Sequence, residues 1–99
     1  MSRPPRVIDV EHLGGRRLRL TFSDDLVREL DLAEMLRAGV FASLDNDDDF
    51  AEVSIDPVAG TICWPNGIDV DPDVLHGDFV PGSGTPPRLL REYRLRPTA

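Results

Sequence analysis

The sequence predicts a small α+β domain built on an antiparallel sheet, and three observations favour this class. Apolar and polar residues alternate with a period of two in the first thirty residues, which is typical of half-buried strands. The spacing then becomes helical, and further short strand-like segments follow. At 99 residues the chain has room for one domain. The predicted order is β-β-β-α-β-β, with one short helix packed on the sheet and a C-terminal helical turn.

The first half of the predicted sheet is a meander of three strands, over residues 7–13, 17–22 and 26–30. The inward positions of the middle strand are Leu18, Leu20 and Phe22. Turns separate the strands at Gly14-Gly15 and at 23–25, where Ser and Asp side chains hydrogen-bond their own backbone.

A helix of about two turns is predicted to follow the meander, starting at Asp31. Asp31 and Glu34 have the spacing of a helix start, in which the first side chain accepts backbone amide hydrogens. Gly39 provides a residue that closes a helix in the left-handed conformation. The apolar stripe of this helix comprises Leu32, Met35 and Leu36, and the buried connector after it comprises Val40, Phe41 and Leu44. So short a helix is unstable alone, so we expect it to lie on the sheet.

The second half begins with a polar loop at 45–49 and a strand over 50–56. Another strand is predicted over 61–64, ended by the turn signal Asn66-Gly67. Asp71-Pro72 then starts a single helical turn, because Asp caps a helix and Pro suits its first position. The expected inward residues are Ala51, Val53, Ile55, Ile62, Trp64, Val74 and Leu75.

The charge of the chain is uneven. There are 18 acidic and 11 basic residues, a net charge of −7, and every basic residue is an arginine. Residues 88–99 carry four Arg and one Glu, a net charge of +3, so the rest of the chain carries −10. Residues 77–87 are rich in Pro and Gly, as linkers are. We therefore expect a loose N-terminus (1–5), one domain (6–76), a linker (77–87) and an Arg-rich tail (88–99).

Residues that carry enzyme or metal chemistry are few. The acidic runs at 45–49 and 69–73 lack the glycine and glutamate that a calcium loop requires. Cys63 lies in an apolar strand, where a thiol packs rather than reacts, and nothing places His12 or His76 beside it. The chain also lacks a Gly-rich phosphate loop and a nucleophile elbow. We expect no enzyme activity, no metal and no cofactor.

Two candidate binding surfaces remain. The first combines an aromatic ring, a tight turn and carboxylates, and it comprises Trp64, Asn66, Gly67, Asp69 and Asp71. Trp is enriched among interface anchors, although burial of the ring in the core is the competing interpretation. The second is the tail, with Arg88, Arg91, Tyr93, Arg94 and Arg96. The tail docks on the acidic body of its own chain, is disordered, or contacts a partner; if it is helical, Leu89 and Tyr93 share one face.

Several short motifs within residues 6–76 carry a family resemblance. They are Phe22-Ser23-Asp24, Asp31-Leu32 with Leu36, Gly39-Val40-Phe41 with Leu44, Phe50 with Val53, the run from Gly60 to Asp69, and Pro72 with Leu75. The Trp-Pro-Asn-Gly-Ile-Asp sequence is the most specific, and together these motifs resemble the bacterial domain of unknown function family 2442. Asp25 stands where that family often has Gly, and His76 where it often has Tyr. The resemblance implies an α+β domain and no established catalytic residue.

The resemblance and the charge together predict a bacterial, cytoplasmic, non-enzymatic binding or regulatory module. Members of the resembled family are sometimes encoded beside a small protein suspected to be a toxin, which implies an antitoxin-like role and a protein partner. The acidic body favours a basic partner. A nucleic-acid-associated regulator acting through the tail is the alternative, since the acidic remainder does not suit phosphate; a small enzyme is disfavoured.

Membrane contact is not expected from this sequence. It has no apolar run long enough to span a bilayer and no leader with the pattern of a signal peptide. Self-association through an exposed strand edge stays open.

Overall fold

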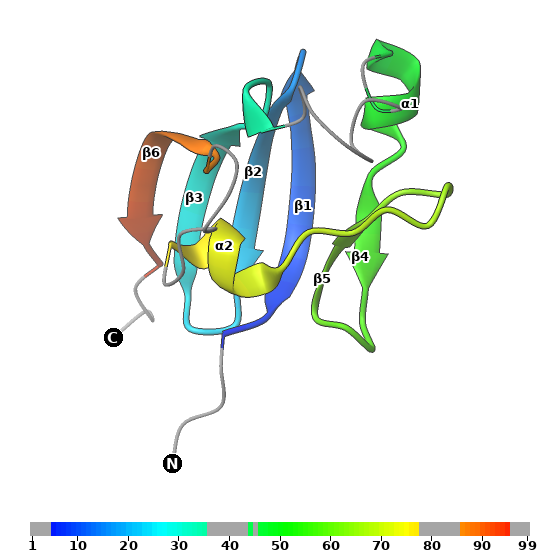
Figure 1. Ribbon diagram of the computed structural model, residues 1–99. Coiled ribbons are helices and arrows are strands. Elements are labelled where there is room, and N and C mark those ends of the chain that lie inside the picture. Colours follow the sequence, from blue (N-terminus) through cyan, green and yellow to red (C-terminus); the bar gives the residue numbers. More distant parts are fainter. Residues whose placement is uncertain (1–4, 36–43, 45, 78–85, 96–99) are drawn as a thin grey trace.

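The computed structural model describes residues 5–35, 44, 46–77 and 86–95. This part of the chain is a small α+β structure with antiparallel strands and two short helices, which confirms the predicted class (Figure 1). In chain order the elements are β1 (Val7–Gly14), β2 (Arg17–Phe22), β3 (Leu26–Asp31), α1 (Asp47–Ala51), β4 (Ser54–Asp56), β5 (Thr61–Cys63), α2 (Pro72–His76) and β6 (Arg88–Arg94).

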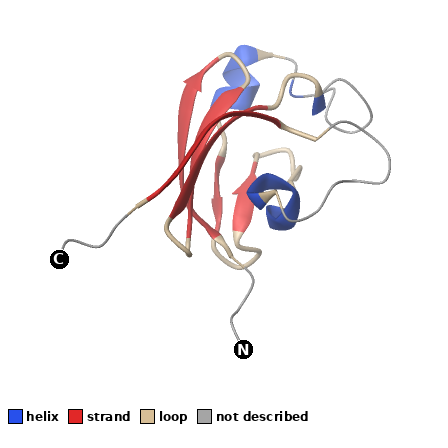
Figure 2. Cartoon of the chain, turned by 90° about the vertical axis from the view of Figure 1, so that its left-hand side faces the viewer, coloured by secondary structure: helices blue, strands red, loops and turns tan. Residues whose placement is uncertain are grey.

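The strands form two antiparallel sheets rather than the single predicted one. The larger sheet has the order β1-β2-β3-β6, and the smaller is the β4–β5 hairpin. The hairpin and α2 lie on the same side of the larger sheet (Figure 2). The amide of Val7 donates a 2.9 Å hydrogen bond to the carbonyl of Gly60, which ties the start of β1 to the end of the hairpin turn. The predicted meander is confirmed, and its strand ends differ from the prediction by at most one residue.

The alternation that predicts the meander also builds the core. Leu18, Leu20 and Phe22 of β2 are fully buried. They belong to one apolar cluster together with Val7, Leu26, Leu30, Leu32, Leu44, Phe50, Ile62, Trp64, Val70 and Leu75. Full burial of one such side chain stabilises the fold by about 1.5–3 kcal/mol. The cluster therefore fixes the hairpin, α1 and α2 against one face of the larger sheet.

Residues 47–49 of the predicted polar loop belong to a helix, and the strand predicted after the loop is shorter than expected. Asn46 caps α1, because its Oδ1 accepts a 2.8 Å hydrogen bond from the amide of Asp48. Acidic residues fill the first turn, where negative charge is favourable. Phe50 turns into the core while Ala51 is exposed, so the predicted inward position of Ala51 is wrong. The strand β4 starts only at Ser54.

The helix predicted from Asp31 lies mostly outside the described residues, which exclude 36–43. β3 continues through Asp31, whose Oδ1 accepts a 2.9 Å hydrogen bond from the amide of Ala33. A turn at Ala33 and Glu34 follows, and Met35 has 3₁₀ conformation. The predicted capping role of the Asp31 side chain is thus found, but at a turn that ends a strand.

The last two elements differ in how well the sequence predicts them. The helical turn is confirmed as α2, with Asp71 as its N-terminal cap and Gly77 closing it at φ 95°. Residues 88–94 form the strand β6, not a helix, and β6 is the fourth strand of the larger sheet. Residues 78–85 of the predicted linker and 96–99 of the predicted tail lie outside the described residues.

Candidate functional site

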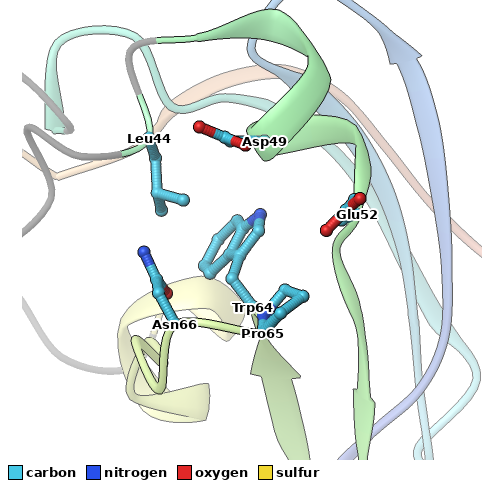
Figure 3. Close-up of a pocket in the computed structure, with 6 residues that line it drawn as sticks. All are labelled: Leu44, Asp49, Glu52, Trp64, Pro65 and Asn66. Atoms are coloured by element: carbon cyan, nitrogen blue, oxygen red, sulfur yellow. The ribbon is translucent and has the colours of Figure 1, made fainter.

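A surface hollow of about 210 Å³ lies between α1 and the turn that follows β5 (Figure 3). Its lining residues are Leu44, Asp49, Glu52, Trp64, Pro65 and Asn66. Asp49 and Glu52 come from α1 and its C-terminal cap, and they lie on the opposite side of the indole from Asn66 and Pro65 (Figure 3). We call this site the acidic hollow.

The Trp64 ring forms the apolar floor of the acidic hollow. It is only 3% exposed, and its Nε1 donates a 2.9 Å hydrogen bond to the carbonyl of Phe50. The Phe50 and Trp64 ring centroids are 5.5 Å apart, so α1 is fixed to the end of β5 by an aromatic contact as well. The floor is therefore rigid and is part of the core. This burial agrees with the competing interpretation of Trp64 as a core residue.

A tight turn supplies the other wall of the hollow. The amide of Gly67 donates a 3.0 Å hydrogen bond to the carbonyl of Trp64, and Gly67 has φ 87°, a conformation that favours glycine. Asn66 Oδ1 accepts a 3.1 Å hydrogen bond from the amide of Ile68. These bonds hold Pro65 and Asn66 at the rim.

The acidic residues of α1 divide into two groups. Asp47 forms an ion pair with Arg16, whose guanidinium lies 5.4 Å from the centre of the Phe50 ring. Asp49 and Glu52 are exposed and form no ion pair within the described part of the chain. An apolar floor with two carboxylates on its rim suits a cationic side chain, because the stem can lie on the ring while the charged group meets the carboxylates.

The structure brings together only part of the first predicted surface. Trp64 and Asn66 line the acidic hollow, whereas Gly67, Asp69 and Asp71 do not. Asp71 Oδ1 accepts a 2.9 Å hydrogen bond from the amide of Asp73 and so caps α2. Asp69 pairs with Cys63 through an isolated β-bridge.

Sequence reasoning missed four lining residues: Leu44, Asp49, Glu52 and Pro65. Asp49 was missed because residues 45–49 were expected to form a loop, and Glu52 because residues 50–56 were expected to form a strand. A signal for α1 is present: Asn46 precedes three acidic residues, and an Asn cap before an acidic first turn is a helix-start pattern.

The second predicted surface, the tail, lies against acidic residues of the same chain. Arg91 Nη1 is 3.9 Å from Glu29 Oε2, and Arg94 Nη1 donates a 2.6 Å hydrogen bond to the carbonyl of Asp24. Arg88 is paired in register with Asp31, and Tyr93 with Val27. The self-docking alternative is therefore found for the described part of the tail; Arg96 lies outside the described residues.

Ion pairs cross the outer face of the larger sheet in a row of alternating charge. The row runs from Glu11 to Arg19, Glu29 and Arg91, one residue from each strand. Arg19 lies 2.5 Å from Glu11 and 3.0 Å from Glu29. The hydrogen bond to Glu29 is the largest cause that raises the pKa of the Arg19 guanidinium.

A second polar cluster joins the β2–β3 turn, α2 and β6. Asp24 Oδ2 lies 2.8 Å from His76 Nε2 and 3.7 Å from Arg94 Nη1, and Asp24 Oδ1 accepts a hydrogen bond from the amide of Leu26. Partial burial tends to raise the pKa of Asp24. The hydrogen bonds from His76 and Leu26, with the neighbouring positive charges, outweigh it and lower that pKa below 3.8.

The remaining reactive side chains have separate surroundings. Cys63 contacts the Ser54 hydroxyl at 3.7 Å, His12 meets the Phe50 ring edge-on, and His76 contacts Asp24. Within the described residues, no three His, Cys, Asp or Glu side chains are grouped as metal ligands would be. No helix in the same part of the chain is long and apolar enough to cross a bilayer.

The fold places the chain among small α+β domains built on an antiparallel sheet. Within that class, the model of one family, "Protein of unknown function (DUF2442)", matches residues 7–79. The chain belongs to this family, as the motifs around the Trp-Pro-Asn-Gly turn predict. No curated protein and no solved structure gives a significant match. The family match includes every residue that lines the acidic hollow and ends before β6.

Proposed function

We propose that the protein is a non-enzymatic binding module that takes a basic protein partner at the acidic hollow. The observation that carries this proposal is the pair of exposed carboxylates, Asp49 and Glu52, on the rim of a fixed apolar floor. An arginine or lysine side chain of the partner would place its stem against Trp64 and its charge between the carboxylates.

The charge of the chain supports the same partner chemistry. A net charge of −7 attracts a basic protein at long range and disfavours acidic ones, which gives speed and specificity of association more than affinity. Asp49 and Glu52 lie three residues apart, so one helical turn presents both carboxylates to the same cationic group.

NMR titration of the ¹⁵N-labelled protein with N-acetyl-arginine methylamide at low salt tests the site. We expect the indole N–H of Trp64 and the amides of α1 to shift, and Asp49→Asn or Glu52→Gln to weaken binding by about threefold or more. Asp48→Asn is the matched control, because it removes the same charge from the same helix outside the hollow. Equal weakening by Asp48→Asn would reduce the effect to unspecific charge attraction and reject the site.

The regulatory role expected from the family resemblance is tested with a protein partner. Co-expression with a small basic protein encoded beside this one is expected to give a complex that survives size-exclusion chromatography. In that complex, Glu52→Gln lowers the affinity and Asp48→Asn leaves it unchanged. A complex insensitive to both carboxylates of the hollow would contradict this binding mode.

The nucleic-acid alternative has less support. The described arginines of the tail lie beside Asp24, Glu29 and Asp31, so phosphate would have to compete with carboxylates of the same chain for these guanidinium groups. It predicts affinity that falls steeply with salt and is lost on removal of residues 88–99. No described contact favours an enzyme, since Cys63, His12 and His76 each contact different groups.

A further inference from the structure

β6 is an edge strand of the larger sheet and contributes no side chain to the core. Six of its seven residues are exposed, only Tyr93 is half-buried, and none belongs to the core cluster. The neighbouring strand differs, because Leu26, Val27 and Leu30 of β3 are all buried. The family match also ends at residue 79, before β6 starts. β6 therefore pairs with the edge of β3 much as a bound peptide segment would.

The outer face of β3 offers β6 a carboxylate and an apolar contact. Glu29 is the partner of Arg91, and a 3.0 Å hydrogen bond from Arg19 Nε of β2 holds its carboxylate in place. Val27, which is 2% exposed, lies opposite Tyr93. Neither Arg19 nor the backbone of β3 depends on β6 for its place in the sheet, because β2, which carries Arg19, pairs with β1 on one side and with β3 on the other.

The other residues that contact β6 are also held in place by elements other than β6. Arg28 Nε lies 2.9 Å from Glu92 Oε2, while Arg28 Nη1 donates a 2.7 Å hydrogen bond to the carbonyl of Leu75 at the end of α2. Arg94 meets Asp24, which lies in the β2–β3 turn. The edge of β3 thus presents a prepared series of charged and apolar groups along one strand.

We propose that the edge of β3 is a docking site for an extended segment of a partner protein, and that β6 occupies this site in cis as a competitor. The segment recognised would have basic residues in the places of Arg91 and Arg94, an aromatic residue in that of Tyr93 and an acid in that of Glu92. Backbone hydrogen bonds to the edge supply affinity, and the side chains at successive positions supply specificity. This proposal goes beyond the binding function assigned to the acidic hollow and uses none of its residues.

Competition requires that β6 can leave the sheet. Backbone pairing with β3 and ion pairs of exposed side chains, such as Arg91 with Glu29, hold β6 in place. Exposed ion pairs contribute little to stability, and β6 adds no side chain to the core cluster. A segment in trans binds only the fraction of molecules whose β6 is displaced, so its apparent affinity falls by that fraction. Weakening the cis contact must therefore strengthen binding in trans.

The full-length double variant Arg91→Glu/Arg94→Glu tests this prediction. The probe is a fluorescent peptide with the native sequence of residues 86–95, followed by anisotropy. We expect the variant to bind it about tenfold or more tightly than the wild-type chain does. Adding Glu29→Arg is expected to reverse the gain, because the new arginine pairs with the glutamate at position 91 and repels the peptide.

Two controls separate this site from unspecific attraction and from the hollow. A peptide of the same composition in shuffled order should bind the double variant at least about tenfold more weakly than the native peptide. Asp49→Asn, added to the double variant, should leave native-peptide binding unchanged. Failure of the hollow therefore does not affect this test, and failure of this test leaves the hollow intact.

Hydrogen exchange of the wild-type full chain tests the proposal without any variant. We expect those amides of β6 that hydrogen-bond to β3 to exchange about 100-fold or more faster than the amides of β2, as a separately opening strand would. Equal protection of β6 and β2 would overturn the proposal, since β6 would then open only with the whole sheet. Failure of the double variant to gain affinity while folded would overturn it as well.

Discussion

The acidic hollow and the edge of β3 differ in what holds their residues in place. Around the hollow, Trp64 and Phe50 are buried and joined by a hydrogen bond, while the rim carboxylates lack ion pairs within the described residues. At the β3 edge, the charges are paired across strands, and no side chain of β6 enters the core. The comparison indicates that the hollow, whose carboxylates have no described ion pair, can bind a partner directly. At the edge of β3, where the charges are already paired with β6, that strand must leave first.

The largest loss of stability should come from a substitution in the floor of the acidic hollow. Trp64→Ala removes a buried ring and its hydrogen bond to Phe50, so we expect a loss of about 3–5 kcal/mol in the free energy of unfolding. Tyr93→Ala at the other region should cost about 1 kcal/mol or less, because that ring is half-buried on an edge strand. Urea denaturation measures both. Similar losses for the two variants would show that β6 is as integral to the fold as the core.

A substitution at the end of α2 should have an intermediate effect. Gly77 has φ 95°, and an added Cβ would lie 2.7 Å from Arg28 Nη1, the arginine that also meets Glu92. Gly77→Ala should therefore destabilise the protein by about 1–2 kcal/mol. It should also speed hydrogen exchange in β6 more than in α1. Unchanged exchange in β6 would show that Arg28 does not help to hold that strand.

The smallest effect concerns the acid end of the pH scale. The pKa of Asp24 is lowered below 3.8 in the folded protein. Its carboxylate therefore stabilises the fold at any pH above the ordinary pKa, and this contribution is lost as the pH falls through the pKa of the folded state. Between about pH 5 and about pH 2.5, Asp24→Asn should therefore lose less stability than the wild type. The urea midpoint across this range measures the difference. An identical pH dependence in the two proteins would contradict it.

The sequence predicts those elements that are determined by residues close together along the chain. Alternation at Leu18, Leu20 and Phe22 was enough to find the meander, and Asp71-Pro72 was enough to find α2. α1 was missed because a run of Asp is typical of loops, and the Phe50 ring contacts His12, Arg16 and Trp64, all of them distant along the chain. Those contacts have no signature at short range.

The strand β6 and the hollow were harder still. β6 pairs with β3, and residues 88–94 alone suit a helix or a disordered tail equally well. The hollow gathers Leu44, the pair Asp49 and Glu52 of α1 and its cap, and Trp64 after β5, so its shape exists only after the chain folds. Trp64 and Asn66 could be named beforehand because they belong to one motif, and the carboxylates could not.

The row from Glu11 to Arg91 has a consequence for where the molecule attracts positive charge. Alternating signs leave that line across the sheet electrically neutral, while α1 carries Asp48, Asp49 and Glu52 without ion pairs in the described chain. Negative charge is therefore concentrated on α1 rather than along this row. Within a screening distance of about 8 Å at physiological salt, a positively charged group is attracted toward α1 before any atoms touch.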